Sequence, residues 1–201
     1  MWQPRQTDRS NEFRAGSADY APIDLEWLSA TIGSIYDCVL RPENWPAMIE
    51  AICVELRFVS GVLGILQLQP GVHALNVHFG LDEEWLAAGG SYVEDMGKIW
   101  GGASRVQAYP LDEPILASQV TPSPEVWEFG YYREILEPRG ICEGVGIALA
   151  KDAKLTGYLG LSRHVSAGSV GQRELDALRL LAPHLRRAVT ISNFFDLKAV
   201  E

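Results

Sequence analysis

Apolar residues recur at every third or fourth position near the start of the chain. They are Leu25, Leu28, Ile32, Ile35, Tyr36 and Val39. This spacing is the period of an amphipathic helix, and it predicts a helix that begins near Ile23 and ends at Arg41 and Pro42. A second helix is predicted from about Pro46, because a proline in the first turn lacks only an N–H that would be unpaired there. Its apolar stripe consists of Met48, Ile49, Ile52, Cys53 and Leu56.

The pattern then changes to that of β-strands. Residues 58–68 contain β-branched side chains and glycines, and Pro70 and Gly71 form a turn signal after them. Residues 72–79 follow as the second strand of a predicted hairpin. Two later strands, 141–150 and 155–163, are joined by a polar turn and predict another hairpin.

The middle of the chain has a weaker pattern. Asp82 can cap a helix that continues through residues 83–96, although a pair of adjacent glycines weakens it. Residues 100–124 show no clear period and contain four prolines, which predicts a loop with one short strand at about 115–119. A further helix is predicted over residues 124–136.

A long helix is predicted at the end of the sequence, from about Gly171 to Phe195. Leu175, Leu178, Ala182, Leu185 and Val189 follow one another at steps of three and four residues. This is the heptad pattern of a coiled coil, so we expect a homodimer whose interface contains Leu175, Leu178, Leu185 and Val189. The apolar pair Phe194 and Phe195 is expected to be exposed beside it, and Pro183 predicts a kink.

The strand at 141–150 has no polar face. One face carries Ile141, Val145, Ile147 and Leu149, and the other carries Cys142, Gly144, Gly146, Ala148 and Ala150. A sheet without a polar face must be covered on both sides. We therefore predict an α+β fold, a PAS/GAF-like three-layer α/β/α domain with a central antiparallel sheet of about five strands. It forms a single domain over residues 23–201, after a flexible tail at residues 1–22.

Charge and composition narrow the possible functions. The 201 residues include 17 Lys and Arg against 26 Asp and Glu, a net charge of −9, and residues 81–143 alone hold twelve acids and four bases. A protein that binds DNA by itself is expected to be basic, so DNA contact by this chain is not expected. Three scattered cysteines fit reduced core thiols and a cytoplasmic protein. The sequence has neither a signal peptide nor an apolar stretch long enough for a membrane span, so no membrane contact is expected.

Three segments of the sequence resemble the amino-terminal domain of LuxR-type helix-turn-helix transcriptional regulators. They are residues 36–50 (YDCVLRPENWPAMIE), 131–141 (YYREILEPRGI) and 159–189 (LGLSRHVSAGSVGQRELDALRLLAPHLRRAV). The order of predicted elements is similar to that of PAS and GAF sensory domains. The resemblance covers about residues 25–195, and it implies a signal-sensing and dimerisation domain. A small-molecule ligand would control DNA binding by a separate C-terminal domain, which we expect to be absent because the chain stops at Glu201.

One motif of that family is incomplete here. Acyl-homoserine-lactone receptors of the family hold their ligand with a Trp, a Tyr four residues later and an Asp about nine residues further on. Trp127 and Tyr131 have the first spacing, but position 140 is Gly and the nearest acid is Glu143. We therefore do not expect a lactone receptor, and core packing of the two aromatic residues is an alternative.

No catalytic or metal-binding pattern stands out. His73 and His78 fall on opposite faces of a predicted strand, and His164 and His184 have no His or Cys at a ligand interval. Nucleotide-binding and hydrolase motifs are absent from the sequence. We therefore expect neither an enzyme, nor a bound metal, nor a cofactor.

Aromatic residues are concentrated in the acidic middle of the chain. We predict a pocket between the sheet and residues 85–132, with Trp100, Tyr109, Trp127 and Tyr131 as lining residues and Glu143 at its mouth. The expected ligand is apolar or cationic, because indole faces attract cations and carboxylates reinforce them. A solid aromatic core is the alternative for the pocket. For the whole chain, the alternatives are a stand-alone ligand-binding or protein-interaction module and, with less support, a small GAF-like enzyme.

Overall fold

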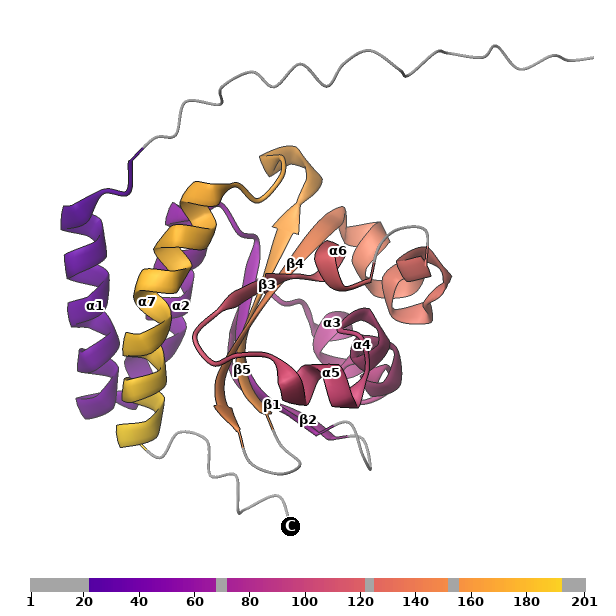
Figure 1. The fold of residues 1–201 in the computed structure, drawn as a ribbon, viewed down its shortest axis with the longest axis horizontal. Coiled ribbons are helices and arrows are strands. Elements are labelled where there is room, and N and C mark those ends of the chain that lie inside the picture. The colour runs from indigo at the N-terminus through magenta and orange to yellow at the C-terminus, as the bar shows by residue number, and fades with distance from the viewer. Residues whose placement is uncertain (1–21, 68–71, 122–124, 152–155, 193–201) are drawn as a thin grey trace, which may run out of the picture.

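A computed structural model of the chain describes residues 22–67, 72–121, 125–151 and 156–192 (Figure 1). The predicted tail, apart from residue 22, and the Phe194–Phe195 pair lie outside these ranges. None of the described helices is long and apolar enough to cross a bilayer.

The centre of the fold is a five-stranded sheet. Its strands are β1 (Ser60–Gln67), β2 (Val72–Phe79), β3 (Pro114–Leu116), β4 (Ile141–Lys151) and β5 (Thr156–His164). The spatial order is β2-β1-β5-β4-β3, and all neighbouring strands are antiparallel. Because helices cover both faces, the predicted three-layer α+β fold is confirmed (Figure 1).

Long helices cover one face of the sheet. They are α1 (Leu25–Leu40), α2 (Trp45–Glu55) and α7 (Gln172–Ile191). The Asp24 side chain caps α1 by accepting hydrogen bonds from the backbone N–H groups of Glu26 and Trp27. The main hydrophobic core lies between these helices and the sheet.

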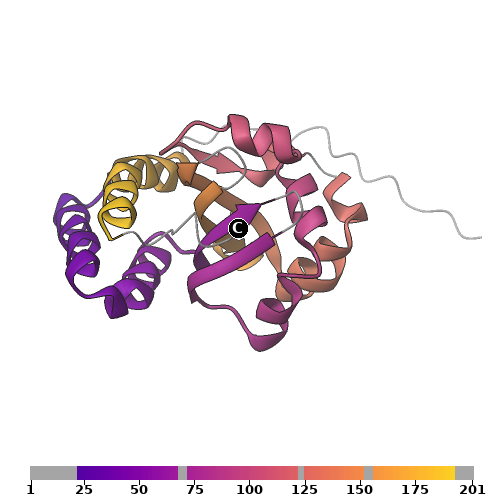
Figure 2. The same cartoon turned by 90° about the horizontal axis from the view of Figure 1, so that it is seen from below.

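Short helices and turns cover the opposite face (Figures 1 and 2). They are α3 (Glu83–Ala88), α4 (Val93–Ile99), α5 (Ala103–Ala108) and α6 (Ala117–Val120), followed by helical turns at Glu125–Glu128, Tyr132–Leu136 and Glu137–Arg139. Two other 3₁₀ turns, Pro42–Asn44 and Val165–Ala167, lie beside α2 and β5. Two small hydrophobic clusters hold this layer.

The structure corrects several predicted elements of this layer. The helix expected over 83–96 is two helices, α3 and α4, which are separated at the adjacent glycines. The helix expected over 124–136 is a 3₁₀ turn followed by a π-helical turn. The region expected to be a loop contains α5 and α6, and its short strand lies at Pro114–Leu116 rather than 115–119.

The heptad face of α7 lies inside the chain. Leu178, Leu185 and Val189 are at most 1% exposed and belong to the main core, while Leu175 is half-buried. The prediction that these residues form a dimer interface is therefore wrong for the buried ones, because their side chains already have apolar partners within the same chain. A heptad pattern shows that a helix face needs a partner and leaves open which chain supplies it.

The cysteines differ in their surroundings. Cys38 and Cys53 are buried, and burial raises the pKa of their thiols to about 11 and about 12. Cys142 is exposed, so the prediction that it is a buried strand residue is wrong. The β4–β5 ladder skips it at an irregularity between Ile141 and Glu143, so it falls outside the strict alternation of the strand.

Arg163 of β5 joins the sheet to the helical layer. Its guanidinium is buried and donates to the backbone carbonyls of Leu56 (2.9 Å) and Arg57 (2.6 Å). It also faces the carboxylate of Glu174 at 3.4 Å and lies over the ring of Phe58. A charge can be buried here because the surrounding elements supply these partners.

Candidate ligand-binding site

The sheet face under the short helices is lined by very small residues. Gly144 and Gly146 of β4 and Gly160 of β5 all lie on it. A Cβ atom at position 146 would be 3.1 Å from the indole ring of Trp100, and one at position 160 would be 3.1 Å from the ring of Tyr158. The glycines therefore let these two rings lie close to the backbone, and they leave the space above the strands unfilled by side chains of their own.

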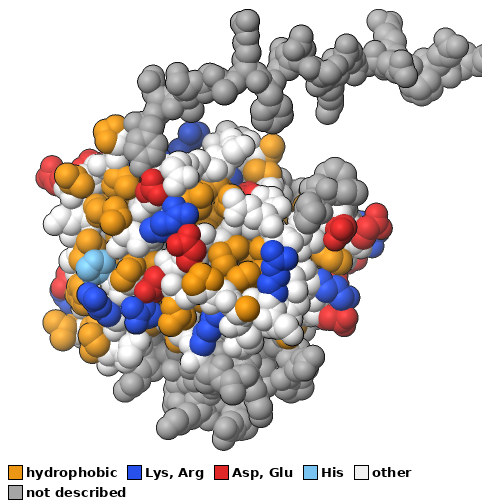
Figure 3. All heavy atoms as spheres, in the orientation of Figure 1, with side chains coloured by type: hydrophobic (Ala, Val, Ile, Leu, Met, Phe, Trp, Pro, Cys, Tyr) orange, Lys and Arg blue, Asp and Glu red, His pale blue; other side chains and the backbone are white. Residues whose placement is uncertain are grey.

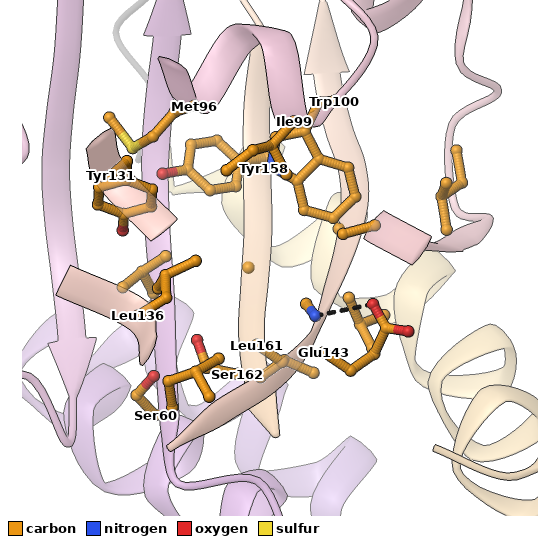
Figure 4. A pocket seen from close by; sticks show the side chains of 18 of the residues that line it. Ser60, Met96, Ile99, Trp100, Tyr131, Leu136, Glu143, Tyr158, Leu161 and Ser162 are labelled. Atoms are coloured by element: carbon orange, nitrogen blue, oxygen red, sulfur yellow. Dashed lines mark hydrogen bonds between the residues drawn. The ribbon is translucent and has the colours of Figure 1, made fainter. Parts of the chain in front are cut away.

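A cavity of about 240 Å³ lies between this face and the short helices (Figure 4). Its apolar wall comes mainly from α3, α4, the turns after residue 125 and the strands. The lining residues include Val62, Trp85, Met96, Ile99, Trp100, Tyr109, Tyr131, Leu136 and Tyr158. Small-molecule sites have this mostly apolar character, although typical volumes begin somewhat higher, at about 300 Å³. The site is therefore suited to a small ligand.

Hydrogen bonds fix the aromatic walls. The hydroxyl of Tyr109 donates to the backbone carbonyl of Trp100 at 2.7 Å, which joins the end of α5 to the end of α4. The indole N–H of Trp85 donates to the hydroxyl of Tyr131 at 2.8 Å. The backbone N–H of Tyr131 reaches the carboxylate of Asp95 at 3.3 Å. These contacts hold the aromatic side chains of three separate segments around one space.

Three of the tyrosine hydroxyl groups in the cavity are neutral at physiological pH. Burial raises the pKa values of Tyr109, Tyr131 and Tyr158 above their ordinary value. They can therefore donate hydrogen bonds and do not act as bases. Although Cys142 is exposed as a residue, partial desolvation of its sulfur, followed by the nearby charge of Glu143, raises the pKa of the thiol, which keeps it protonated and weakly nucleophilic.

Glu143 contributes the one charged side chain among the described lining residues, and its carboxylate is already hydrogen-bonded. It accepts from the backbone N–H (3.1 Å) and hydroxyl (2.5 Å) of Ser118 and from the backbone N–H of Gly144 (3.0 Å). Glu143 therefore attaches α6 to β4. Because its oxygens already accept these hydrogen bonds, Glu143 is less available to pair with a cationic ligand than we expected from the sequence.

The structure brings together four of the five residues predicted to bind ligand. Trp100, Tyr109, Tyr131 and Glu143 line the cavity, whereas the side chain of Trp127 lies outside the described part of the chain. Sequence reasoning missed the contributions of the strands and of α4, which are Ser60, Val62, Met96, Ile99, Tyr158 and Ser162. One face of the strand at 141–150 carries only small side chains, and this pattern in the sequence could have indicated where the floor of the cavity lies.

Among the described residues, no group of three His, Cys, Asp or Glu side chains is placed to hold a metal ion. The side chain of His164 interacts locally, with the hydroxyl of Ser166 at 2.7 Å. His184 instead forms a 3.1 Å hydrogen bond with Tyr36, between α7 and α1.

Comparison with known proteins identifies the fold. No protein-family model matches the sequence, and no curated protein sequence matches it. Among solved structures, the LBD domain of VqsR from Pseudomonas aeruginosa is 14% identical, with a TM-score of 0.65 over 86% of this chain and 99% of that chain. CepR2 from Burkholderia cenocepacia, an N-acylhomoserine-lactone-dependent LuxR-family transcription factor, is 16% identical, with a TM-score of 0.57 over 88% of this chain and 99% of that chain.

A GAF domain from an Acinetobacter phosphoenolpyruvate-protein phosphotransferase is also similar. It is 14% identical, with a TM-score of 0.50 over 85% of this chain and 95% of that chain. At such identities the likeness establishes the fold. The chain therefore has the GAF-like sensory-domain fold that is also found in LuxR-family regulators, which confirms the predicted resemblance at the level of the fold.

Proposed function

We propose that this chain is the signal-sensing domain of a LuxR-type transcriptional regulator and that it binds a small molecule in the cavity. The observation that carries the proposal is the apolar cavity of about 240 Å³, enclosed by aromatic residues over a floor of glycines. A domain that served only as a scaffold would be expected to fill such a space with larger side chains, because protein interiors are close-packed. The fold shared with VqsR and CepR2 supports the same conclusion.

In this proposal, the ligand acts on a DNA-binding domain that is separate from these residues, and the regulator works in the cytoplasm as a homodimer. The net charge of −9 agrees with a domain that does not itself contact DNA. Because the heptad face of α7 is buried in the chain, the dimer would use other surfaces. Catalysis is a weaker alternative, since the Tyr and Cys side chains of the cavity are held in their protonated forms.

A thermal-shift screen with small molecules tests the proposal. A ligand stabilises the folded state by mass action, by about 2.7 kcal/mol at a hundredfold excess over its dissociation constant. Val62→Phe places a large ring in the cavity, so we expect this variant to fold and to lose the stabilisation by ligand. Val54→Phe makes the same change on the exposed side of α2 and should retain it.

Two results would contradict the proposal. One is a complete absence of stabilising compounds for the unmodified protein. The other is a set of compounds that stabilise Val62→Phe as strongly as Val54→Phe, because such compounds would bind elsewhere.

A further inference from the structure

The cavity reaches the protein surface beside Glu143. Among the described lining residues, only Ser118 of α6 and Cys142 of β4 are exposed, and both lie next to Glu143. Figure 4 shows Glu143 across the cavity from Tyr131 and Met96. Met96, on that other side, is buried. The mouth of the cavity therefore lies between α6 and the start of β4.

The carboxylate of Glu143 holds α6 at this mouth. One of its oxygens accepts hydrogen bonds from the backbone N–H groups of Ser118 and Gly144, and the other accepts from the hydroxyl of Ser118. Hydrogen bonds to a charged acceptor are stronger than those between neutral groups. These contacts join the middle of α6 to the first residues of β4.

Other contacts hold the two ends of α6. Before the helix, Leu116 of β3 pairs with Val145 of β4. After it, the hydroxyl of Thr121 is hydrogen-bonded to the backbone carbonyls of Lys98 (3.1 Å) and Ile99 (2.9 Å). Because both ends are fixed, α6 can move away from the mouth when the bonds to Glu143 open, while β3 stays paired and α4 stays in place.

We propose that Glu143 and Ser118 form a latch that controls entry to the cavity, and that α6 moves as a lid when their hydrogen bonds open. A helix of four residues is not stable by itself in water, so the position of α6 depends on contacts of this kind. Glu143 is then a positioning residue rather than a contact of the ligand. This inference rests on the proposed function, because it assigns the entrance of the same cavity.

The labelling rate of a thiol inside the cavity measures entry without a ligand. In Val62→Cys/Cys142→Ser, a thiol is introduced at a lining position and the exposed native thiol is removed. Methyl methanethiosulfonate, a small neutral reagent, labels the thiols, and mass spectrometry of peptides gives the rate for each. Cys53 is the reference, because it is buried in the main core. We expect the introduced thiol to react faster than Cys53, since α6 can open while that core stays closed.

Substitutions in the latch should speed this labelling. Ser118→Ala removes one hydrogen bond, so we expect an increase of about fivefold, the effect of a typical net hydrogen bond. Glu143→Ala removes all three bonds and should give a larger increase. Glu143→Gln should lie between Glu143→Ala and the unmodified latch, because its amide oxygen can still accept. Adding Ser118→Ala to Glu143→Ala should have no further effect, since the hydroxyl has already lost its partner.

Arg139→Gln is the matched control on another side of the cavity. The guanidinium of Arg139 forms ion pairs with Asp82 and Glu84 at the start of α3, and it does not line the cavity. Loss of these pairs weakens the fold and can speed the labelling of Cys53. The rate at the introduced thiol should stay unchanged, because the latch of α6 is intact.

The inference is wrong if neither Ser118→Ala nor Glu143→Ala speeds labelling of the introduced thiol, or if Arg139→Gln speeds it as much as Ser118→Ala does. It is also wrong if that thiol reacts no faster than Cys53, or already reacts as fast as an unfolded thiol while the latch is intact.

Hydrogen exchange across residues 117–121 gives the answer if the thiol background does not fold. Ser118→Ala, made alone, must then speed this exchange, and Arg139→Gln must not. The proposed function fails separately, when the broad screen finds no compound whose stabilising effect is lost in Val62→Phe, because neither labelling nor exchange needs a ligand.

Discussion

At the scale of single residues, Gly140 shows how one position shapes the edge of the site. It has a φ of +64°, in the left-handed region, and it follows the last helical turn before β4. A Cβ atom there would lie 2.4 Å from Nε2 of His164. Both the positive φ and the close contact with His164 favour glycine, which gives a structural reason for glycine at a position where lactone receptors of the resembling family have an acid.

We expect Gly140→Ala to lower the free energy of unfolding by more than about 1 kcal/mol, because alanine is strained at this φ and its methyl group meets His164. Gly33→Ala is the matched control. Gly33 lies within α1 with no atom near its Cβ position, so alanine should raise the free energy of unfolding by about 0.5–1 kcal/mol. Urea denaturation measures both values. If the two substitutions change the free energy of unfolding in the same direction, this explanation is contradicted.

The sequence identified some site residues and missed others for a physical reason. Trp100, Tyr109 and Tyr131 are large aromatics in the acidic middle of the chain, and they could be selected by type. Ser60 and Ser162 are ordinary strand residues, and they come to line one cavity through a pairing across about a hundred positions of sequence. Strand alternation predicts which residues share a face, but the register between distant strands decides which of them meet.

At the scale of elements, charged contacts attach one wall of the cavity to α7. The segment between α5 and β3 carries Asp112, which forms an ion pair with Arg186 at 2.8 Å, and Glu113, which forms one with Arg179 at 2.8 Å. Acidic and basic side chains accordingly lie next to one another on this surface (Figure 3). At the start of the segment, Tyr109 lines the cavity. A ligand that moves this wall would therefore also move residues that are in direct contact with α7.

Removal of these contacts should loosen the wall. In Arg179→Gln/Arg186→Gln we expect faster hydrogen exchange across residues 109–116, including the amide of Asp112, which donates to the carbonyl of Ala148 at 3.0 Å. Each partly exposed ion pair contributes up to about 1 kcal/mol, so the loss of both pairs is expected to increase the exchange rate by up to about thirtyfold. Ligand affinity should fall in the same variant.

Arg173→Gln is the control for this experiment. Arg173 also lies on α7, but its ion pair is with Glu55 of α2, away from the wall. Exchange in residues 109–116 should therefore stay as in the unmodified protein. Equal acceleration in both variants would show that α7 as a whole had been weakened and that the wall contacts have no special role.

The accuracy of the predicted elements follows from their length and regularity. The helices α1, α2 and α7 have strong apolar periods, and the strands of both hairpins are apolar runs separated by turn signals. The approximate positions of all these elements are confirmed. The layer from α3 to the turns at Glu137–Arg139 consists of pieces too short to show a helical period. Such short helices form because the sheet and the aromatic clusters hold them, which local sequence does not reveal.

At the scale of the whole molecule, the two sides of the sheet are unequally packed. The main core on the side of α2 and α7 contains many fully buried side chains, including Ile52, Leu178 and Leu185. On the cavity side, the small clusters around Val93 and Trp85 keep residual exposures of 4–8%. Less apolar surface is buried per element there, so the layer that forms the ligand site is held by the weaker packing.

This asymmetry predicts the order in which the molecule opens. In the absence of added ligand, amides of α4 and α5 should exchange through local openings of lower free energy than amides of α2, α7 and β5, which should require openings close to global unfolding. A ligand bound in the cavity joins the short helices to the sheet, so it should slow exchange in α4 and α5 more than on the other side. Hydrogen exchange followed by mass spectrometry, with Val62→Phe as the variant that should show no added protection, measures both effects. Equal protection on both sides of the sheet would mean that the ligand only shifts global stability, and that the cavity layer does not move as a unit of its own.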